Sequence, residues 1–172
     1  MIKRETTGAI AAVIIEPIQG TNGNVVPPAG FFNGVRELAR EIGAVFISDE
    51  MITGFGRTGR MFGCDHEGVV PDMMTIGKGF GGGFPVSGVV TTTEIASAKP
   101  WANPSGSSSS YGGNPLASAA CDITLQMILR DNLADNSAKV GAAMLKRLQE
   151  MQARQPLIGA VRGRGLMIGV DL

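Results

Sequence analysis

The chain has 172 residues and a mass of 17.9 kDa, and its 15 basic and 15 acidic residues give a formal net charge of zero. Hydrophobic residues make up 44% of the chain and charged residues 17%, which is typical of a globular protein and not of a disordered one. The neutral charge argues against a nucleic-acid-binding protein, and the longest purely apolar run, residues 9–15, is too short for a transmembrane helix.

Short apolar strands alternate with a helix in the first half of the chain. The pattern predicts strands at residues 11–15, 44–48, 73–76 and 86–93, and a helix over residues 29–43. Continuous apolar strands with an intervening helix are typical of α/β proteins, in which helices cover a mostly parallel sheet. We therefore predict an α/β fold built on such a sheet.

The second half is predicted to be mainly helical. A polar loop at residues 103–110 leads into helical patterns at residues 115–128 and 140–151. Two further strands are predicted at residues 157–161 and 166–170, on either side of a segment rich in arginine and glycine.

This pattern divides the chain into two parts. We expect residues 1–130 to belong to a large domain, and residues 131–172 to form an interdomain helix and the beginning of a small α+β domain. Because a strand pattern runs almost to the last residue, the chain is expected to be a piece of a longer protein. Cys64 and Cys121 lie far apart and outside any CxxC pattern, which predicts free thiols and a cytoplasmic protein.

Three predicted strands end in charged residues: Glu16 and Asp49 follow directly, and Lys78 follows after Gly77. Ligands of open α/β sheets bind at the carboxyl ends of strands, although each residue alone is more simply read as a solvated strand end or an ion-pair partner. Glycine changes this interpretation for Lys78, because 25 of the 172 residues are glycine and eleven of these lie between Gly54 and Gly88. Such crowding predicts backbone that lies close to a bulky ligand beside Lys78.

A lysine and an aspartate at neighbouring strand ends fit carbonyl chemistry. The lysine amine forms a Schiff base with an aldehyde, and a carboxylate holds a pyridine nitrogen protonated so that the ring withdraws electrons. The pair Lys78 and Asp49 therefore predicts pyridoxal 5'-phosphate (PLP) as a cofactor. Ser107–Ser110, before the helix predicted from Pro115, offer hydroxyl and N–H groups for its phosphate, and a plain serine-rich linker fits the same residues.

Other motifs are less informative. Residues 54–59 and 77–82 both match GxGxxG, but neither has the strand-then-helix context of a dinucleotide-binding fold. His66 is the only histidine and no GxSxG motif is present, which disfavours a serine hydrolase. Cys64 with His66 is too sparse a set for zinc.

Taken together, these motifs resemble the class III, PLP-dependent aminotransferases of fold type I. They occur in the family's order and spacing over nearly all of the chain. The matching stretches are EPIQG at residues 16–20, DEMITGFGRTG at 49–59, PD at 71–72, GKG at 77–79, GGGFP at 81–85, YGGNP at 111–115, and VRG to GLM at 161–167.

The resemblance implies a role for each matching residue. Lys78 matches the lysine that forms a Schiff base with PLP and then moves a proton, and Asp49 matches the carboxylate on the pyridine nitrogen. Met51 stands where a residue packs on the ring face. Ser109 and Ser110 match the pair that reaches the phosphate of the neighbouring subunit's cofactor, which implies a homodimer. The fold implied is a mostly parallel sheet with helices on both faces.

Two departures from the family pattern concern the substrate. Ile52 replaces a glutamine near the cofactor's phenolic oxygen, so that hydrogen bond is expected to be absent. Thr21 stands where ornithine-type members carry a glutamate, and both changes favour ω-amines or amino acids used with pyruvate. The family's phosphate-binding turn, ring-stacking aromatic residue and carboxylate-binding arginine find no match in the chain.

The resemblance implies PLP-dependent transamination, in which an amino group passes from an amino acid or ω-amine donor to a keto acid. The expected partners are these small molecules and a second subunit, with no nucleic acid and no membrane. Two alternatives stay open. In the first, the chain is a truncated, non-catalytic remnant or a subunit-interface fragment. In the second, it is a PLP-dependent aminomutase or epimerase of the same family.

Overall fold

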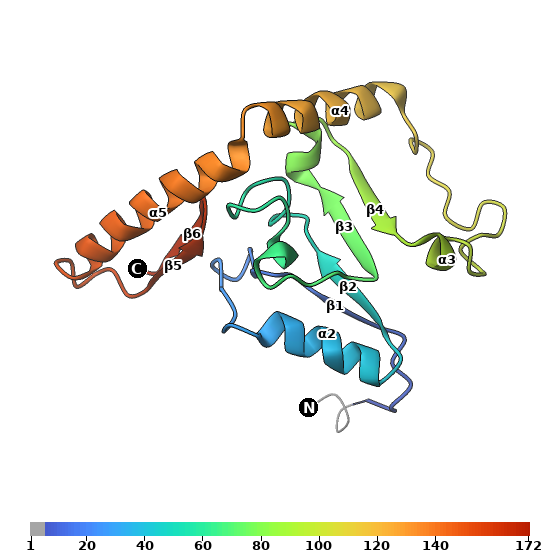
Figure 1. Cartoon of the computed structure of the whole chain (residues 1–172), viewed down its shortest axis with the longest axis horizontal. Helices are drawn as coiled ribbons and strands as arrows, with labels where there is room; N and C mark the ends of the chain where they lie inside the picture. Colours follow the sequence, from blue (N-terminus) through green and yellow to red (C-terminus); the bar gives the residue numbers. More distant parts are fainter. Residues whose placement is uncertain (1–5) are drawn as a thin grey trace.

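The computed structural model describes residues 6–172 and contains a central sheet with the strand order β1-β2-β3-β4 (Figure 1). The first three strands are parallel and β4 is antiparallel to β3. A separate antiparallel hairpin, β5–β6, lies beside helix α5. The elements are β1 (Ala12–Ile15), α2 (Phe31–Glu41), β2 (Val45–Asp49), the 3-10 helix η1 (Gly63–His66), β3 (Met73–Gly77), the 3-10 helix η2 (Lys78–Gly81), β4 (Ser87–Thr91), α3 (Thr93–Ala96), α4 (Pro115–Arg130), α5 (Leu133–Gln152), β5 (Val161–Arg164) and β6 (Met167–Val170).

The hydrophobic core lies between α2 and one face of the sheet. Phe32 of α2 and Phe46 of β2 are both buried, and their rings pack edge to face with centroids 5.2 Å apart. Ala39, Ala44, Cys64 and Val69 complete the buried cluster. Burial of this apolar surface is the main force that fixes α2 on the sheet.

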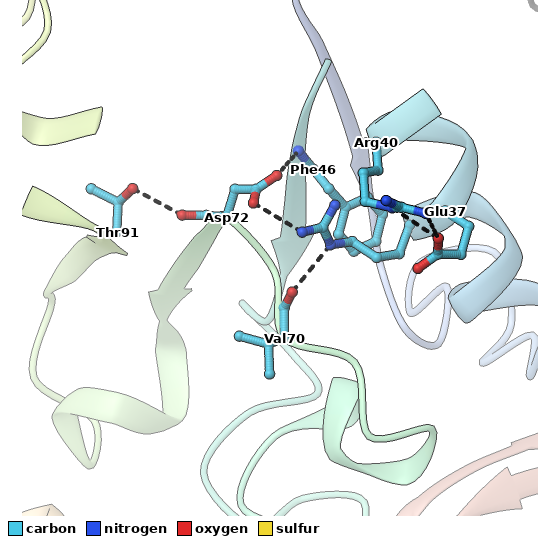
Figure 2. A network of polar contacts seen from close by, with 7 residues as sticks. Glu37, Arg40, Phe46, Val70, Asp72 and Thr91 are labelled. Atoms are coloured by element: carbon cyan, nitrogen blue, oxygen red, sulfur yellow. Dashed lines mark hydrogen bonds and ion pairs between the residues drawn. The ribbon is translucent and has the colours of Figure 1, made fainter. Parts of the chain in front are cut away.

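Asp72, immediately before β3, ties three elements together through hydrogen bonds (Figure 2). Its carboxylate accepts hydrogen bonds from the Phe46 backbone N–H of β2 at 2.8 Å and from the Arg36 guanidinium of α2 at 3.2 Å. The same guanidinium donates to the Val70 carbonyl, and the Thr91 hydroxyl of β4 donates to the Asp72 carbonyl. These bonds fix the beginning of β3 between its neighbours, and thereby the position of its far end.

Most predicted elements of the chain are confirmed, and the C-terminal hairpin is the main exception. The strand predicted at residues 157–161 is wrong, because β5 covers Val161–Arg164 and includes the arginines that were expected to separate the strands. In a two-stranded hairpin one face remains open, so a strand needs no continuous apolar run. Arg162 is held there by Asp171, at 2.6 Å and 2.7 Å, and by the Gly23 carbonyl at 2.8 Å.

Two smaller differences concern the end of β4 and the start of α5. Residues 93–96 form the short helix α3, where strand was predicted to continue to residue 93, because the Thr92 side chain caps the backbone N–H of Ile95. Helix α5 begins at Leu133, earlier than the predicted pattern. The division of the chain into domains near residue 130 stays a prediction. No helix among residues 6–172 is long and apolar enough to cross a membrane.

Small residues on α5 allow the hairpin turn and the loop after Gly56 to approach this helix closely. Gly56 lies against Ala134, and Gly59 lies against Ala138. Gly141 faces the backbone of Gly165, the residue at the hairpin turn, so a Cβ at residue 141 would collide with that backbone. Residues of α5 and of this hairpin turn line two cavities.

We expect Gly165→Ala to lower the free energy of unfolding by about 2–4 kcal/mol. Gly165 has a φ of 55°, and an added Cβ would lie 2.7 Å from the Arg57 carbonyl oxygen, so the substitution combines backbone strain with overpacking. Urea unfolding would measure the change. The matched control is Gly34→Ala within α2, where the new methyl group meets nothing within 4 Å. We expect this substitution to raise the free energy of unfolding by about 0.5–1 kcal/mol. Equal stability of the two variants would contradict this account.

Candidate functional site

The carboxyl ends of β2 and β3 bring Asp49 and Lys78 to the same edge of the sheet. The two strands are parallel, with Asp49 in register with Thr75, and Lys78 follows directly after β3. Glu16 also follows a parallel strand, but its carboxylate accepts the Gly20 backbone N–H at 2.9 Å and so closes the next turn. Of the three predicted strand-end groups, Asp49 and Lys78 thus follow neighbouring strands and remain the candidate pair.

The Asp49 carboxylate is held in place through one of its two oxygens. Oδ1 accepts hydrogen bonds from the Met51 backbone N–H at 3.1 Å and from the Thr75 hydroxyl at 3.0 Å. Within residues 6–172 no protein group donates to Oδ2. A carboxylate fixed in this way can accept a hydrogen bond from a cationic N–H group of a ligand.

Lys78 occupies an unusual backbone position between two glycines. Its φ of 45° lies in the left-handed region, which non-glycine residues rarely adopt. The side chain is exposed, and no acidic partner among the described residues pairs with it. Gly77 makes room for the Met51 side chain, because a Cβ at Gly77 would lie 2.9 Å from the Met51 sulfur. The amine of Lys78 is thus available, with an apolar side chain beside its strand.

A cavity of about 290 Å³ lies in front of this edge. It is lined by Lys78 and by two further predicted site residues, Met51 and Ile52, and Leu133 of α5 and Leu166 of the hairpin turn contribute apolar walls. The structure therefore brings together three of the six predicted site residues in one cavity. Neither Asp49 nor the predicted serines line it, although Asp49 ends the strand that leads to Met51 and Ile52.

Phe55 forms part of the cavity wall that the sequence analysis did not identify. Phe55 lines the cavity and has a φ of 60°, so it too is strained. Its ring stacks on Phe80 at a centroid distance of 5.0 Å and packs edge to face on Phe62 at 5.6 Å. These contacts compensate for the strain and fix the loop that borders the cavity.

Glu50 is the second residue that sequence reasoning missed. It follows Asp49 directly, but strand alternation sends its side chain to the face covered by α2, where it is fully buried. Its two carboxylate oxygens accept hydrogen bonds from the hydroxyls of Ser48 and Thr53 and from the backbone N–H groups of Gly63 and Cys64. The four donors come from β2, from the loop that follows it and from η1, so Glu50 joins these three segments.

The same buried surroundings act on the thiol of Cys64. Burial, and next the nearby Glu50 carboxylate, raise the pKa of Cys64 far above its ordinary value. Burial also raises the pKa of the Cys121 thiol. Both cysteines are free and buried, in agreement with the prediction of unpaired thiols. A thiol with a raised pKa is a poor nucleophile, so neither cysteine is a candidate for covalent catalysis.

The serine loop lies apart from the cavity. Ser109 and Ser110 are exposed, and the Ser109 hydroxyl accepts the Tyr111 backbone N–H at 3.4 Å. The expectation of free N–H groups at the following helix is wrong at its first turn, because the Asn114 side chain accepts from the N–H groups of Leu116 and Ala117. Any anion bound here would depend on the serine hydroxyls and not on these amides.

The chain was compared with protein families and with proteins of known sequence. The model of the family described as "Aminotransferase class-III" matches residues 1–172. Ornithine aminotransferase of Bacillus subtilis (strain 168) is 42% identical over 172 residues, which is 99% of this chain and 42% of that protein. Ornithine aminotransferase of an Exiguobacterium species is 43% identical over 94% of this chain and 40% of its own length. The chain thus spans about two fifths of the length of these relatives.

Solved structures of transaminases are also similar to this chain. An (S)-enantioselective omega-transaminase from Thermomicrobium roseum superposes with a TM-score of 0.90, at 39% identity, over 99% of this chain and 38% of that one. The ornithine aminotransferase of Toxoplasma gondii, described with partial occupancy of PLP at its active site, gives a TM-score of 0.91 at 35% identity, over 96% of this chain and 39% of its own.

Proposed function

We propose a transaminase function from one established premise: the chain belongs to the class III aminotransferase family. Its fold is that of the fold type I aminotransferases, as the resemblance implied. The proposed reaction moves an amino group from an amino acid or ω-amine donor to a keto acid. The observation that carries the proposal is the meeting of an unpaired lysine amine, a carboxylate with a free oxygen and an apolar cavity at the edge of a parallel sheet.

The residues present fit PLP, the cofactor of this family. Asp49 Oδ2 is free to hold a protonated pyridine nitrogen, and Met51 and Ile52 offer apolar surface to a ring. Lys78 has a free amine that lines the same cavity. When bound, PLP supplies an electron-withdrawing ring that stabilises negative charge on the amino-bearing carbon of a substrate.

The proposed roles of the protein groups follow from their positions. Asp49 keeps the ring nitrogen protonated through a charge-assisted hydrogen bond, while its own orientation is fixed by Thr75 and by the Met51 N–H. Lys78 would hold the cofactor through its Nζ, and the same amine would carry a proton to and from the substrate carbon. Leu133, Leu166 and the Phe55 ring exclude water from one side of the cavity.

We further propose that the protein is a cytoplasmic homodimer in which the serine loop serves the other subunit. Ser109 and Ser110 are exposed and lie outside the cavity of their own chain, which fits a contact with the phosphate of the neighbouring subunit's cofactor. Helix α4, which follows this loop, carries exposed Leu116 and Ile123, at 65% and 58% of their full exposure. Such an apolar surface fits a subunit interface.

The test uses the 172-residue chain and PLP. Reduction with borohydride fixes PLP to the lysine it has bonded, and peptide mass mapping identifies that lysine. We expect the label at Lys78, with little at Lys139 and Lys146, which are exposed on α5 and serve as internal controls. Labelling spread evenly over these lysines would overturn the proposed function.

Asp49→Asn is expected to weaken PLP binding by about 10–100-fold. The substitution keeps the shape of the side chain but removes the charge, and a charge-assisted hydrogen bond is worth about 1.5–3 kcal/mol. Titration of the chain with PLP, followed by visible absorbance, measures the dissociation constant. Asp122→Asn on the exposed side of α4 removes the same charge away from the cavity and is expected to leave the constant unchanged. Equal constants for the two variants would remove Asp49 from the proposed site.

A further inference from the structure

A second cavity, of about 420 Å³, lies on the other side of the loop that borders the first one. Its polar side is formed by Thr58 and Arg60 of the loop, His66 of η1 and Arg164 of β5. Its opposite wall is α5, which contributes only small or apolar residues and no charged group. Two arginines and a histidine from three separate elements therefore face one hollow.

The two arginines of this cavity lack acidic partners. Within residues 6–172, neither Arg60 nor Arg164 forms an ion pair or a side-chain hydrogen bond. Other arginines of the chain are paired, as Arg36 is with Asp72 and Arg162 is with Asp171. Arg162 lies two residues before Arg164 on the same strand and is paired, so membership of β5 does not explain why Arg164 lacks an acidic partner.

Among the charged groups that act on His66, the two arginines outweigh the one acid. Burial, followed by Arg164, lowers the pKa of His66, and Arg60 acts in the same direction, so both guanidinium groups lie close enough to repel a charged imidazole. Asp65 acts in the opposite direction, but its carboxylate accepts the backbone N–H of Phe62 at 2.8 Å. The imidazole Nε2 lies 2.9 Å from the Thr58 hydroxyl oxygen.

The backbone that carries these groups is fixed before any ligand arrives. The Arg57 carbonyl accepts hydrogen bonds from the Leu166 N–H at 3.0 Å and from the Ser137 hydroxyl at 2.7 Å, which joins the loop, the hairpin turn and α5. Gly165 packs against the Thr58 and Gly59 backbone. Arg60 and Arg164 are therefore held on the same side of α5 at little additional cost in backbone entropy.

We propose that this second cavity binds a small oxyanion, with a phosphate, sulfate or carboxylate group held between Arg60 and Arg164. His66, when protonated, and the Thr58 hydroxyl donate further hydrogen bonds to it. Arginine guanidinium groups match the planar or tetrahedral arrangement of such oxygens and bind them bidentately. The proposal is independent of PLP and of the transaminase function, since no residue proposed to bind PLP lines this cavity.

The single histidine of the chain makes the test direct, because its imidazole Cε1–H gives one proton NMR signal. The full chain, without PLP, is titrated with sulfate in one arm and with succinate in the other, at constant ionic strength maintained with chloride. We expect a saturable shift of the His66 signal with at least one of these anions. The bound anion should also raise the pKa of His66, because negative charge favours the protonated imidazole. A response to sulfate alone indicates phosphate-like ligands, and a response to succinate alone indicates carboxylates.

Charge-removing variants separate a built site from general ionic effects. The substitution of either Arg60 or Arg164 by glutamine is expected to weaken anion binding about tenfold. Arg147→Gln removes the same charge from an exposed position of α5 outside the cavity and should leave binding unchanged. The signal of the folded variants in the absence of anion confirms that the fold is kept. The proposal is overturned if neither anion gives a saturable shift in the unmodified chain, or if Arg147→Gln weakens binding as much as the two cavity variants do.

Discussion

The visible absorbance that PLP develops with the chain is expected to disappear in Lys78→Ala. The variant lacks the only amine that lines the first cavity among the described residues, so PLP has no protein carbon–nitrogen bond to form there. We also expect the rate at which an amino-acid or ω-amine donor converts PLP to fall about 10³-fold, because the proposed proton carrier is lost as well. Absorbance spectra before and after addition of the donor measure both effects.

The matched control for this variant is Lys139→Ala. Lys139 is exposed on α5 and does not line the cavity, so its loss should leave the spectrum unchanged. Far-UV circular dichroism establishes that Lys78→Ala is folded, which is expected because the side chain is exposed and has no described partner. A folded Lys78→Ala variant that retains the full absorbance band would remove Lys78 from its proposed role.

Glu50→Ala is expected to lower the free energy of unfolding by about 3–5 kcal/mol. The substitution leaves the N–H groups of Gly63 and Cys64 buried without an acceptor, and each such group costs about 1–3 kcal/mol. The hydroxyls of Ser48 and Thr53 also lose their acceptor. Chemical denaturation with urea measures the loss.

Glu41→Ala is the surface control for this experiment. Glu41 is exposed at the end of α2 and forms no ion pair with another described residue, so its removal should change stability by less than about 0.5 kcal/mol. Glu50→Gln keeps the volume but replaces two acceptor positions with an N–H₂ group, and it should lie between the two. If Glu50→Ala is as stable as Glu41→Ala, the buried carboxylate does not hold the loop.

Candidate site residues could be predicted from the sequence where a local pattern was enough to identify them. Lys78 and Asp49 could be found from the sequence, because each directly follows an apolar run and parallel strands end at one edge. Glu50 has the same signal as Asp49, and only strand alternation distinguishes the open face from the covered one. Counting two-residue alternation forward from Phe46, which is buried, would have placed Glu50 in the core.

Other features depend on contacts between segments that are far apart in sequence. The stacking of Phe55 on Phe80 and the meeting of Arg60 with Arg164 require the loop, η2 and the hairpin to be placed in space first. The hairpin itself was displaced in the prediction because polar residues in β5 are stabilised by long-range partners, as Arg162 is by Gly23. Local periodicity contains no information on such partners.

The backbone conformation at residue 78 also bears on why lysine, and not glycine, occupies that position. A residue at a φ of 45° costs least when it is glycine, and Lys78 already stands between Gly77 and Gly79. A sequence optimised only for folding would therefore place a third glycine there. Lysine occurs instead, exposed and without a stabilising partner among the described residues. The conformational penalty thus supports the proposed chemical role of Lys78, and this support comes from a single chain, without any other sequence for comparison.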